Sequence, residues 1–467
     1  MKLSRVFVYL GIAVIVVGAA LVFRQGREKP IEGTLFIDNE NVASGYTLFS
    51  PLNGTGAYLI NNQGEVINSW ESEYFPGNSE YLMEDGTLYR GGKLTQDVIT
   101  HGGASGIIEK YSWDGELLWD YEYLGDDFIS HHDIEVLPNG NILIQGWERK
   151  TQKEALAVGM DKEYATEDGV TVDYLVELNP ETKEIVWEWH IWDHLVQNRD
   201  KTKPGFGKIK DNPNRINVNY YDYSRPVDWT HANSVDYNED LDQILLSVRE
   251  FNEIWIIDHS TTTKEANGST GGRYGMGGDL LYRWGNDFAY GQGTNDDRIL
   301  YLQHDAEWVP NGHPGEGNIT VYSNGQREDV REYSTVEEIK PPLTEDGFYE
   351  MDGDKFVPAD RIWTYGDGEE ETFFSFFISG SQRLPNGNTF ITSGAEGRFI
   401  EVTSDKQIVW EYLNPLQDYS DYFEEDVRQV FRAYKYPEDF AGFDGRDLTS
   451  KGLLVDETPS EKSPESE

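Results

Sequence analysis

Short apolar stretches that alternate with turn signals cover most of the chain from about residue 45 onward. The clearest case occurs twice, as HDIEVLPNG at residues 132–140 and as HDAEWVPNG at residues 304–312. Each phrase opens on a histidine, continues through a short apolar segment and ends on a Pro-Asn-Gly turn, the pattern of a β-strand that enters a hairpin. We therefore predict two strands that each begin at a histidine.

Three weaker copies of the same phrase occur elsewhere. Residues 231–238, HANSVDYN, again place an asparagine seven positions after a histidine; residues 379–388, SGSQRLPNGN, keep the turn but have Ser379 at the histidine position; residues 81–86, YLMEDG, keep little more than the turn. A supersecondary unit repeated at intervals of tens of residues indicates a repeat architecture. Three copies thus carry histidine at one structural position, at His132, His231 and His304.

A second recurring element is a strand that ends on tryptophan. It occurs six times, ending at Trp70, Trp119, Trp187, Trp284, Trp363 and Trp410. Several of these strands follow a tight turn that is itself preceded by another strand. Six such strand pairs, alternating with the hairpins, predict an all-β fold, a six-bladed β-propeller built from four-stranded sheets. We expect the six tryptophans to pack between neighbouring blades.

The N-terminal region has a different pattern. Residues 6–23 form an uninterrupted apolar run with basic residues on both sides. A run of this length lies at the lower limit for spanning a bilayer and also fits a signal sequence. We predict a signal anchor or transmembrane segment at residues 1–30, which would place the protein outside the cytoplasmic membrane, exported and membrane-anchored.

The remaining chain divides into a linker at residues 31–44, the propeller at residues 45–447 and an acidic disordered tail at residues 448–467. Four polar, glycine-rich insertions interrupt the repeats, at residues 151–171, 191–226, 267–278 and 328–359. We expect them to be loops on the propeller faces that shape an entrance. A short helix is predicted through residues 424–434.

Composition supports the all-β class and excludes several functions. Aromatic residues make up 13% of the chain, including 28 Tyr and 13 Trp, which favours strands over helices. The 84 acidic against 39 basic residues give a net charge of −45, and such a field repels nucleic acid and anionic membrane surfaces. The chain has no cysteine, which excludes disulfides, thiolate catalysis and Cys-ligated metals.

The repeat position gives the candidate chemistry. In a propeller the innermost strands line the central axis and begin at one mouth, so His132, His231 and His304 should converge there. Arg249 follows residues 244–247, the second strand of the blade that His231 opens, and can reach the same mouth. Asn233 lies two residues after His231, on the same side of a regular strand.

His131 is an alternative to His132, because the two histidines are adjacent. The common offset to the asparagine of the turn favours His132. Ser379 occupies the histidine position of a fourth copy.

Two chemistries fit three histidines and an arginine around one axis. Three neutral imidazoles are typical ligands of zinc or iron. Transfer of an anionic group is the alternative, with one histidine as nucleophile and the other groups holding the oxygens. The permanent charge of Arg249 would repel a metal ion, which favours group transfer. A non-enzymatic membrane-tethered binding propeller is a third interpretation, since many propellers only bind.

Several of these phrases together resemble the bacterial arylsulfate sulfotransferases. The matching segments are HHD at 131–133 with LPNGN at 137–141, DWTHANSV at 228–235, LLSVR at 245–249, QHDA at 303–306 and VFRAY at 430–434. The order and spacing of the three histidines and the arginine are similar across the whole propeller.

The resemblance implies a PAPS-independent enzyme that moves a sulfuryl group from an aryl sulfate ester to a phenolic acceptor by a ping-pong route. His304 would be the nucleophile and carry a transient sulfohistidine. The residues that would bind the sulfuryl oxygens or protonate the departing phenoxide are His132, His231, Asn233 and Arg249. Ser379 would replace a hydroxyl-bearing residue of the same site. No cofactor or metal is implied.

An aromatic run precedes Ser379 and consists of Phe373, Phe374, Phe376 and Phe377. These side chains fit either an apolar mouth for the substrate rings or the buried face of a blade strand. We expect core packing to be their main role.

Overall fold

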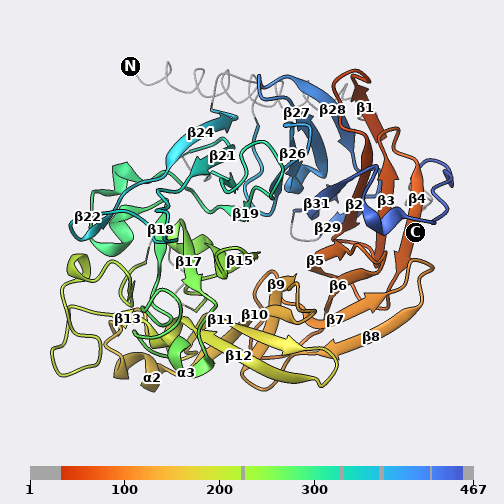
Figure 1. Ribbon diagram of the computed structural model, residues 1–467. Helices are drawn as coiled ribbons and strands as arrows, with labels where there is room; N and C mark the ends of the chain where they lie inside the picture. The colour runs from red at the N-terminus through yellow and green to blue at the C-terminus, as the bar shows by residue number, and fades with distance from the viewer. Residues whose placement is uncertain (1–32, 222–226, 326–330, 368–372, 421–422, 456–467) are drawn as a thin grey trace, which may run out of the picture.

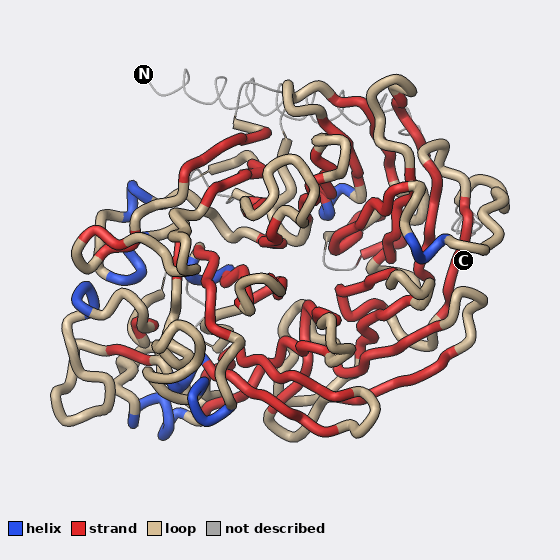
Figure 2. The backbone as a smooth tube through the Cα atoms, viewed as in Figure 1, coloured by secondary structure: helices blue, strands red, loops and turns tan. Residues whose placement is uncertain are grey.

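The computed structural model describes residues 33–221, 227–325, 331–367, 373–420 and 423–455. Its strands form six sheets arranged around a central axis (Figure 1), and strands dominate over helices throughout (Figure 2). The predicted all-β, six-bladed propeller is confirmed.

Five of the six sheets have four strands, which follow one another from the axis outward. Blade 1 contains β31 (Val430–Pro437), β2 (Gly45–Pro51), β3 (Gly56–Asn61) and β4 (Val66–Glu71). Blade 2 contains β5 (Pro76–Leu82), β6 (Leu88–Lys93), β7 (Gly106–Tyr111) and β8 (Leu117–Glu122). Blade 3 contains β9 (Phe128–Val136), β10 (Ile142–Lys150), β11 (Val170–Asn179) and β12 (Glu184–His190).

The second half of the ring follows the same plan. Blade 4 contains β15 (Ala232–Asn238), β16 (Gln243–Val248), β17 (Glu253–Asp258) and β18 (Tyr282–Trp284). Blade 5 contains β19 (His304–Trp308), β20 (Ile319–Ser323), β21 (Thr335–Lys340) and β24 (Asp360–Tyr365). Blade 6 contains β25 (Gly380–Arg383), β26 (Thr389–Ser393), β27 (Arg398–Val402), β28 (Ile408–Leu413) and, outermost, β1 (Gly33–Ile37).

Small elements occupy the connections between the blade strands. They are the pairs β13 (Leu195–Val196) with β14 (Ile216–Asn217), β22 (Met351–Asp352) with β23 (Lys355–Phe356) and β29 (Asp418–Ser420) with β30 (Glu425–Val427), and the short helices α2 (Gln152–Ala157) and α3 (Thr263–Ala266).

Strands from both ends of the described chain complete the ring. The innermost strand of blade 1 is β31, which pairs antiparallel with β2, and the outermost strand of blade 6 is β1. The helix predicted at residues 424–434 is therefore wrong, since these residues contribute to β30 and β31. Every residue from 430 to 435 is buried. A strand buried on both faces lacks the apolar-polar alternation that identifies a strand in sequence.

A further difference concerns blade 5, where β21 lies inside the insertion predicted at residues 328–359. This strand contains two buried carboxylates, Glu337 and Glu338, and charged residues in a sequence usually indicate an exposed loop. Glu337 pairs with Arg361 at 2.8 Å, and Glu338 pairs with Arg383. A carboxylate can be buried when a guanidinium satisfies it, so the charged letters of the sequence do not mark a loop here.

The tryptophans of the fourth strands link neighbouring blades, as predicted. In four of them the indole N–H donates to the segment that follows the third strand of the next blade. The acceptors are the Ser112 carbonyl for Trp70 at 2.9 Å, Thr261 Oγ1 for Trp187 at 3.1 Å, the Ser404 carbonyl for Trp363 at 2.9 Å and the Asn62 carbonyl for Trp410 at 2.7 Å. The repeated tryptophan thus forms a hydrogen bond between neighbouring blades in these four cases.

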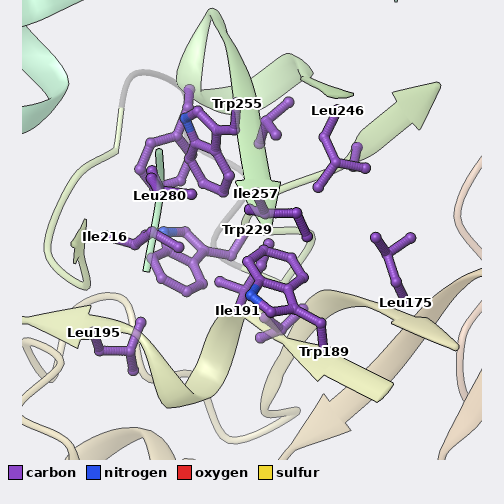
Figure 3. Packing of buried hydrophobic residues seen from close by; sticks show 14 of the residues in the cluster. Leu175, Trp189, Ile191, Leu195, Ile216, Trp229, Leu246, Trp255, Ile257 and Leu280 are labelled. Carbon is purple, nitrogen blue, oxygen red and sulfur yellow. The ribbon is translucent and has the colours of Figure 1, made fainter. Parts of the chain in front are cut away.

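The largest apolar cluster lies between blades 3 and 4 (Figure 3). Trp189 and Trp255 are fully buried in it. The insertion at residues 191–226 contributes Ile191, Leu195 and Ile216 to the same cluster, so this insertion is part of the core as well as a surface connection. Truncating a buried tryptophan at such a position costs about 3–5 kcal/mol.

The predicted signal anchor at residues 1–30 lies outside the described residues. In the described ranges, no helix has the length and apolarity that crossing a membrane requires. Residues 451 and 454, which belong to the segment predicted as a tail, donate backbone hydrogen bonds to the carbonyls of Val66 and Gly64 in blade 1.

Candidate active site

The three histidines of the repeat lie close together at the propeller axis. His132 is in β9, His231 immediately precedes β15, and His304 is the first residue of β19, three neighbouring innermost strands (Figure 1). The rings of His132 and His231 are 4.8 Å apart. The ring centroid of Phe431, in β31, lies 5.7 Å from that of His132 and 6.1 Å from that of His304.

Irregular backbone aims these side chains. His132 and His231 have φ angles of 51° and 49°, in the left-handed region that non-glycine residues rarely adopt. The strand pairing shifts register at each of the three positions, which marks β-bulges. Bulges re-aim side chains and are common beside active sites. One of them lies between Ala232 and Ser234, so the regular alternation assumed for Asn233 does not apply.

His304 is held in one tautomer by Asn324. The Asn324 amide nitrogen donates to the carbonyls of Ser375 at 2.8 Å and Ile378 at 2.6 Å, which fixes its oxygen as the atom facing His304. That oxygen lies 2.7 Å from His304 Nδ1, so Nδ1 carries the proton and Nε2 carries the lone pair. Burial and the charge of Arg249 hold the pKa of His304 well below its usual range. His304 is therefore a neutral imidazole with its lone pair on Nε2.

His231 is paired with a carboxylate. Its Nδ1 lies 2.6 Å from Asp228 Oδ2. Although burial opposes ionisation of Asp228, the charge and hydrogen bond of His231 lower the pKa of this carboxyl to about 2. Asp228 is thus ionised, and its carboxylate accepts a hydrogen bond from the His231 Nδ1–H.

His132 is paired with its neighbour in sequence. The Nδ1 atoms of His131 and His132 are 2.9 Å apart, and His131 Nε2 lies 3.0 Å from Asp173 Oδ1. His131 also stacks on Trp147, with centroids 3.9 Å apart and planes 8° from parallel. His131 therefore contacts the Nδ1 side of the His132 ring. Within the described residues, none of the Nε2 atoms of His132, His231 and His304 has a hydrogen-bond partner.

The remaining predicted residues differ in placement. Arg249, at the end of β16, bonds to Glu250 and lies close enough to His304 to lower its pKa. Asn233 is fully buried, and its amide donates to the Gln303 carbonyl at 2.8 Å, beside His304. Ser379 is also fully buried, and its hydroxyl accepts the Gly394 N–H at 2.9 Å. Asn233 thus positions the backbone next to His304, and Ser379 fixes the backbone at Gly394.

Below the histidines, Arg432 crosses the axis. It contacts three other innermost strands: Asp133 of β9 at 3.1 Å, the Asn233 carbonyl of β15 at 3.0 Å and Asp305 of β19 at 2.8 Å. Tyr434 completes the set at 2.9 Å. This buried cation separates the histidines from the opposite end of the same strands.

Several site residues lie outside the repeat pattern and were not predicted. Asp173, Asp228 and Asn324 each face a histidine Nδ1 or its partner. Asp228 opens the matched segment at residues 228–235 but was assigned no role, and nothing in the sequence marks the other two. Gly103 gives a second example, because its carbonyl accepts the His132 N–H at 2.9 Å and a Cβ there would lie 2.1 Å from the His132 ring. His101 is in the same loop, and burial lowers its pKa.

The phenylalanine run before Ser379 divides in two. Phe373 is buried against Tyr322 and Tyr365, as expected for a core residue. Phe374, Phe376 and Phe377 are only part-buried. Core packing therefore accounts for one of the four.

A metal centre finds no support in the described ranges, where no group of three or more His, Asp or Glu side chains is arranged to hold a metal ion. The Nδ1 atoms of the three histidines are all engaged, and the permanent charges of Arg249 and Arg432 are close enough to His304 to lower its pKa.

A family model describes almost the whole propeller. The model of the arylsulfotransferase (ASST) family matches residues 52–414, which include all of the predicted site residues. The chain belongs to the arylsulfotransferase family. Membership supports an aryl sulfotransferase activity in general, with a small aryl donor and acceptor, and confirms the resemblance read from the motifs.

Other comparisons add only likeness of fold. A protein of unknown function from Bacteroides caccae is 11% identical, with a TM-score of 0.44, 85% of this chain and 100% of that chain being covered. Virginiamycin B lyase from Staphylococcus aureus is 10% identical, with a TM-score of 0.34 and coverages of 82% and 88%. Hydrazine synthase from Kuenenia stuttgartiensis is 10% identical, with a TM-score of 0.35 and coverages of 81% and 81%. Comparison with curated proteins gave no match.

Proposed function

We propose that this protein moves a sulfuryl group from an aryl sulfate ester to a phenolic acceptor by a ping-pong route, with a sulfohistidine at His304 as the intermediate. The observation that carries the proposal is the state of His304. Its Nδ1 proton is fixed by Asn324, its pKa is held low, and its Nε2 has no partner among the described residues. A buried histidine with a free lone pair next to Arg249 is suited to attack an anionic group.

In the first half-reaction, the lone pair of His304 Nε2 forms a bond to sulfur while the bond between sulfur and the aryl oxygen breaks. The aryl oxide that leaves takes one proton from the site. The imidazole ring becomes positively charged and carries the SO₃ group. By analogy with phosphoryl transfer, the transition state is loose and its charge lies on the peripheral and leaving oxygens.

In the second half-reaction, a phenol loses its proton to the site, and its oxygen bonds to sulfur as the bond between sulfur and Nε2 breaks. Arg249 and His231, the latter backed by the Asp228 carboxylate, are placed to hold the sulfuryl oxygens in both halves. A preorganised cation and a preorganised hydrogen-bonding side chain of this kind stabilise developing charge in a site that excludes water. No metal or cofactor takes part in this scheme.

The test compares the full-length protein with His304→Asn, using 4-nitrophenyl sulfate as donor and phenol as acceptor. We expect acceptor-dependent release of 4-nitrophenol that falls by about 10⁴-fold or more in the variant, as is typical when a nucleophile is removed. His313→Asn is the matched control, because His313 lies in the hairpin turn at the other end of β19. Without acceptor, intact-protein mass spectrometry should detect one added SO₃ on wild type alone.

Full activity in a folded His304→Asn protein would refute the role of His304. Specific binding of a ligand without turnover of any aryl sulfate would instead support the non-enzymatic binding propeller. A stoichiometric transition metal in chelator-washed protein would revive the metalloenzyme interpretation.

We also propose that the propeller acts outside the cytoplasmic membrane, tethered by residues 1–30. The apolar run at residues 6–23 supports this proposal. Protease added to intact cells should digest the propeller, whereas a cytoplasmic marker should survive. Resistance equal to that of the marker would contradict the proposed location.

A further inference from the structure

Three polar groups form a line behind the histidine site. Asp173 Oδ1 lies 3.0 Å from His131 Nε2, and His131 Nδ1 lies 2.9 Å from His132 Nδ1. The contact with Asp173 is a close polar contact rather than an aligned hydrogen bond. The line ends at His132 Nε2, which has no hydrogen-bond partner among the described residues. Only the far end of the line is thus available to a substrate.

His132 by itself is poorly suited to hold a positive charge. Burial lowers its pKa well below the usual range, and the neighbouring His231 and His131 and the charge of Arg432 act in the same direction. Nevertheless, each half-reaction needs a group that releases or takes one proton. If His132 takes a proton, the positive charge that results must move to a group farther from Arg249 and Arg432.

His131 is placed to take that charge. The Asp173 carboxylate lies beside it, and the parallel Trp147 ring at 3.9 Å offers a π face to an imidazolium. Asp173 is itself held in place, since it accepts the Ala232 N–H at 3.0 Å and the Thr230 hydroxyl. Two basic groups near His131, His101 and His132, have their pKa lowered by burial.

We propose that His132 and His131 form a two-step proton relay for the phenolic oxygen, in which His131 and Asp173 are positioning residues that store the charge. This inference rests on the proposed sulfuryl transfer. It assigns the acid-base step to His132 and leaves His231 and Arg249 to hold the sulfuryl oxygens.

The protons balance as follows. Before donor cleavage, His131 carries protons on both nitrogens beside Asp173, and His132 carries one on Nε2. The leaving aryl oxide takes the His132 Nε2 proton, and the His131 Nδ1 proton moves to His132 Nδ1, which leaves both rings neutral. The incoming phenol reverses both transfers. His132 is neutral before and after each step, so the positive charge resides only on His131.

The relay predicts a dependence on the leaving group that a merely structural defect would not give. The variant His131→Asn keeps a hydrogen-bond acceptor near His132 Nδ1 but cannot become a cation. We measure the burst of phenol release without acceptor from phenyl sulfate, whose leaving group is strongly basic, and from 4-nitrophenyl sulfate, whose leaving group is weakly basic. The variant should lose about 100-fold or more with phenyl sulfate and only a few-fold with 4-nitrophenyl sulfate. The variant Asp173→Asn should show the same pattern.

An equal loss with both donors would show that His131 acts only in packing, and no loss with either would show that it has no role. Either result overturns the relay while leaving the proposed transfer intact. No burst from any aryl sulfate in the wild type would refute the proposed function and the relay with it.

A second measurement needs no variant and so does not depend on folding of an altered core. In mixtures of H₂O and D₂O, the wild-type burst with phenyl sulfate should depend on the deuterium fraction along a curve, because two protons move in the step. A linear dependence would indicate one moving proton and would overturn the relay.

Discussion

The two ends of three neighbouring strands, β9, β15 and β19, carry opposite chemistry. One end has the imidazoles of His132, His231 and His304; the other has the carboxylates of Glu135, Asp236 and Glu307. Burial and carboxylate neighbours raise the pKa of Glu135 well above its usual range, and burial raises that of Asp236 to about 7. Burial shifts the imidazole pKa values of His132 and His304 downward instead.

The difference teaches that burial moves both kinds of group towards their neutral forms, and that partners decide which of them keeps a charge. Arg432 separates the two ends and keeps its charge because Asp133 and Asp305 face it. The buried imidazoles of His132 and His304 thereby stay neutral next to fixed cations, which suits nucleophilic attack on an anion.

Among the tests of this comparison, breaking the imidazole end at Gly103 is expected to give the largest loss of activity. The substitution Gly103→Ala places a Cβ 2.1 Å from the His132 ring, so the ring must move. A displacement of about 1 Å in a catalytic group costs on the order of 100-fold in rate, and we expect that loss of sulfuryl transfer. Gly102→Ala is the matched control, since its Cβ would meet nothing within 4 Å. Equal activity of the two variants would contradict a role for the His132 position.

The boundary between the two ends is tested by Arg432→Met. The change leaves Asp133 and Asp305 buried without a cation, and we expect a loss of about 3–5 kcal/mol in the free energy of unfolding. Urea denaturation at neutral pH measures it. Arg398→Met removes a part-exposed ion pair with Glu411 and should cost less than about 1 kcal/mol. Comparable losses in both variants would show that the axial pairs do not differ from surface pairs.

His259 sharpens the comparison, because it is a largely buried histidine whose partners are carboxylates. Although burial opposes its charged form, hydrogen bonds with Asp242 and Glu177 raise the pKa of His259 to about 9. Its stabilising contribution is therefore complete below pH about 6.5 and disappears as the pH rises through 9. His259→Gln should lower the free energy of unfolding by about 1–3 kcal/mol at pH 6 and by little at pH 10. A pH-independent difference would contradict this account.

The smallest effect is expected at the carboxylate end. Because the pKa of Glu135 is raised in the folded state, its favourable contribution is present below pH about 4.5 and is lost as the pH rises through its folded-state pKa. Glu135→Gln should match wild type at pH 4 and exceed it by about 1 kcal/mol at pH 8.5 in urea denaturation. As a control, the substitution Glu84→Gln at an exposed position should leave the free energy of unfolding close to that of wild type at both pH values. A variant less stable than wild type at pH 8.5 would refute the assignment.

Much of the fold was readable from the chain because each blade repeats the same local signals. Hairpin turns after the histidine phrases and tryptophans at the strand ends located the innermost and fourth strands of most blades. The misses have specific causes. β31 was predicted as a helix because a strand buried on both faces shows no alternation, and β21 was hidden by Glu337 and Glu338, which are buried with arginine partners.

The candidate site was predictable only where it follows the repeat. His132, His231 and His304 share one repeat position, so their convergence followed from the architecture. Asp228, Asn324 and Asp173 come from other elements, and their importance lies in one atomic contact each. A sequence records residue types, but it does not record which nitrogen of a histidine is engaged.

The sequence by itself determined the all-β class, the six repeats, the histidine position and the family, because these depend on local patterns that recur along one chain. Only the tertiary structure decided that β31 closes the ring, that Arg432 divides the axis, and whether each histidine Nδ1 faces an amide oxygen, another histidine or a carboxylate. Those properties depend on contacts between residues up to several hundred positions apart and on burial, which sets the pKa of each group, and neither is fixed until the blades have assembled.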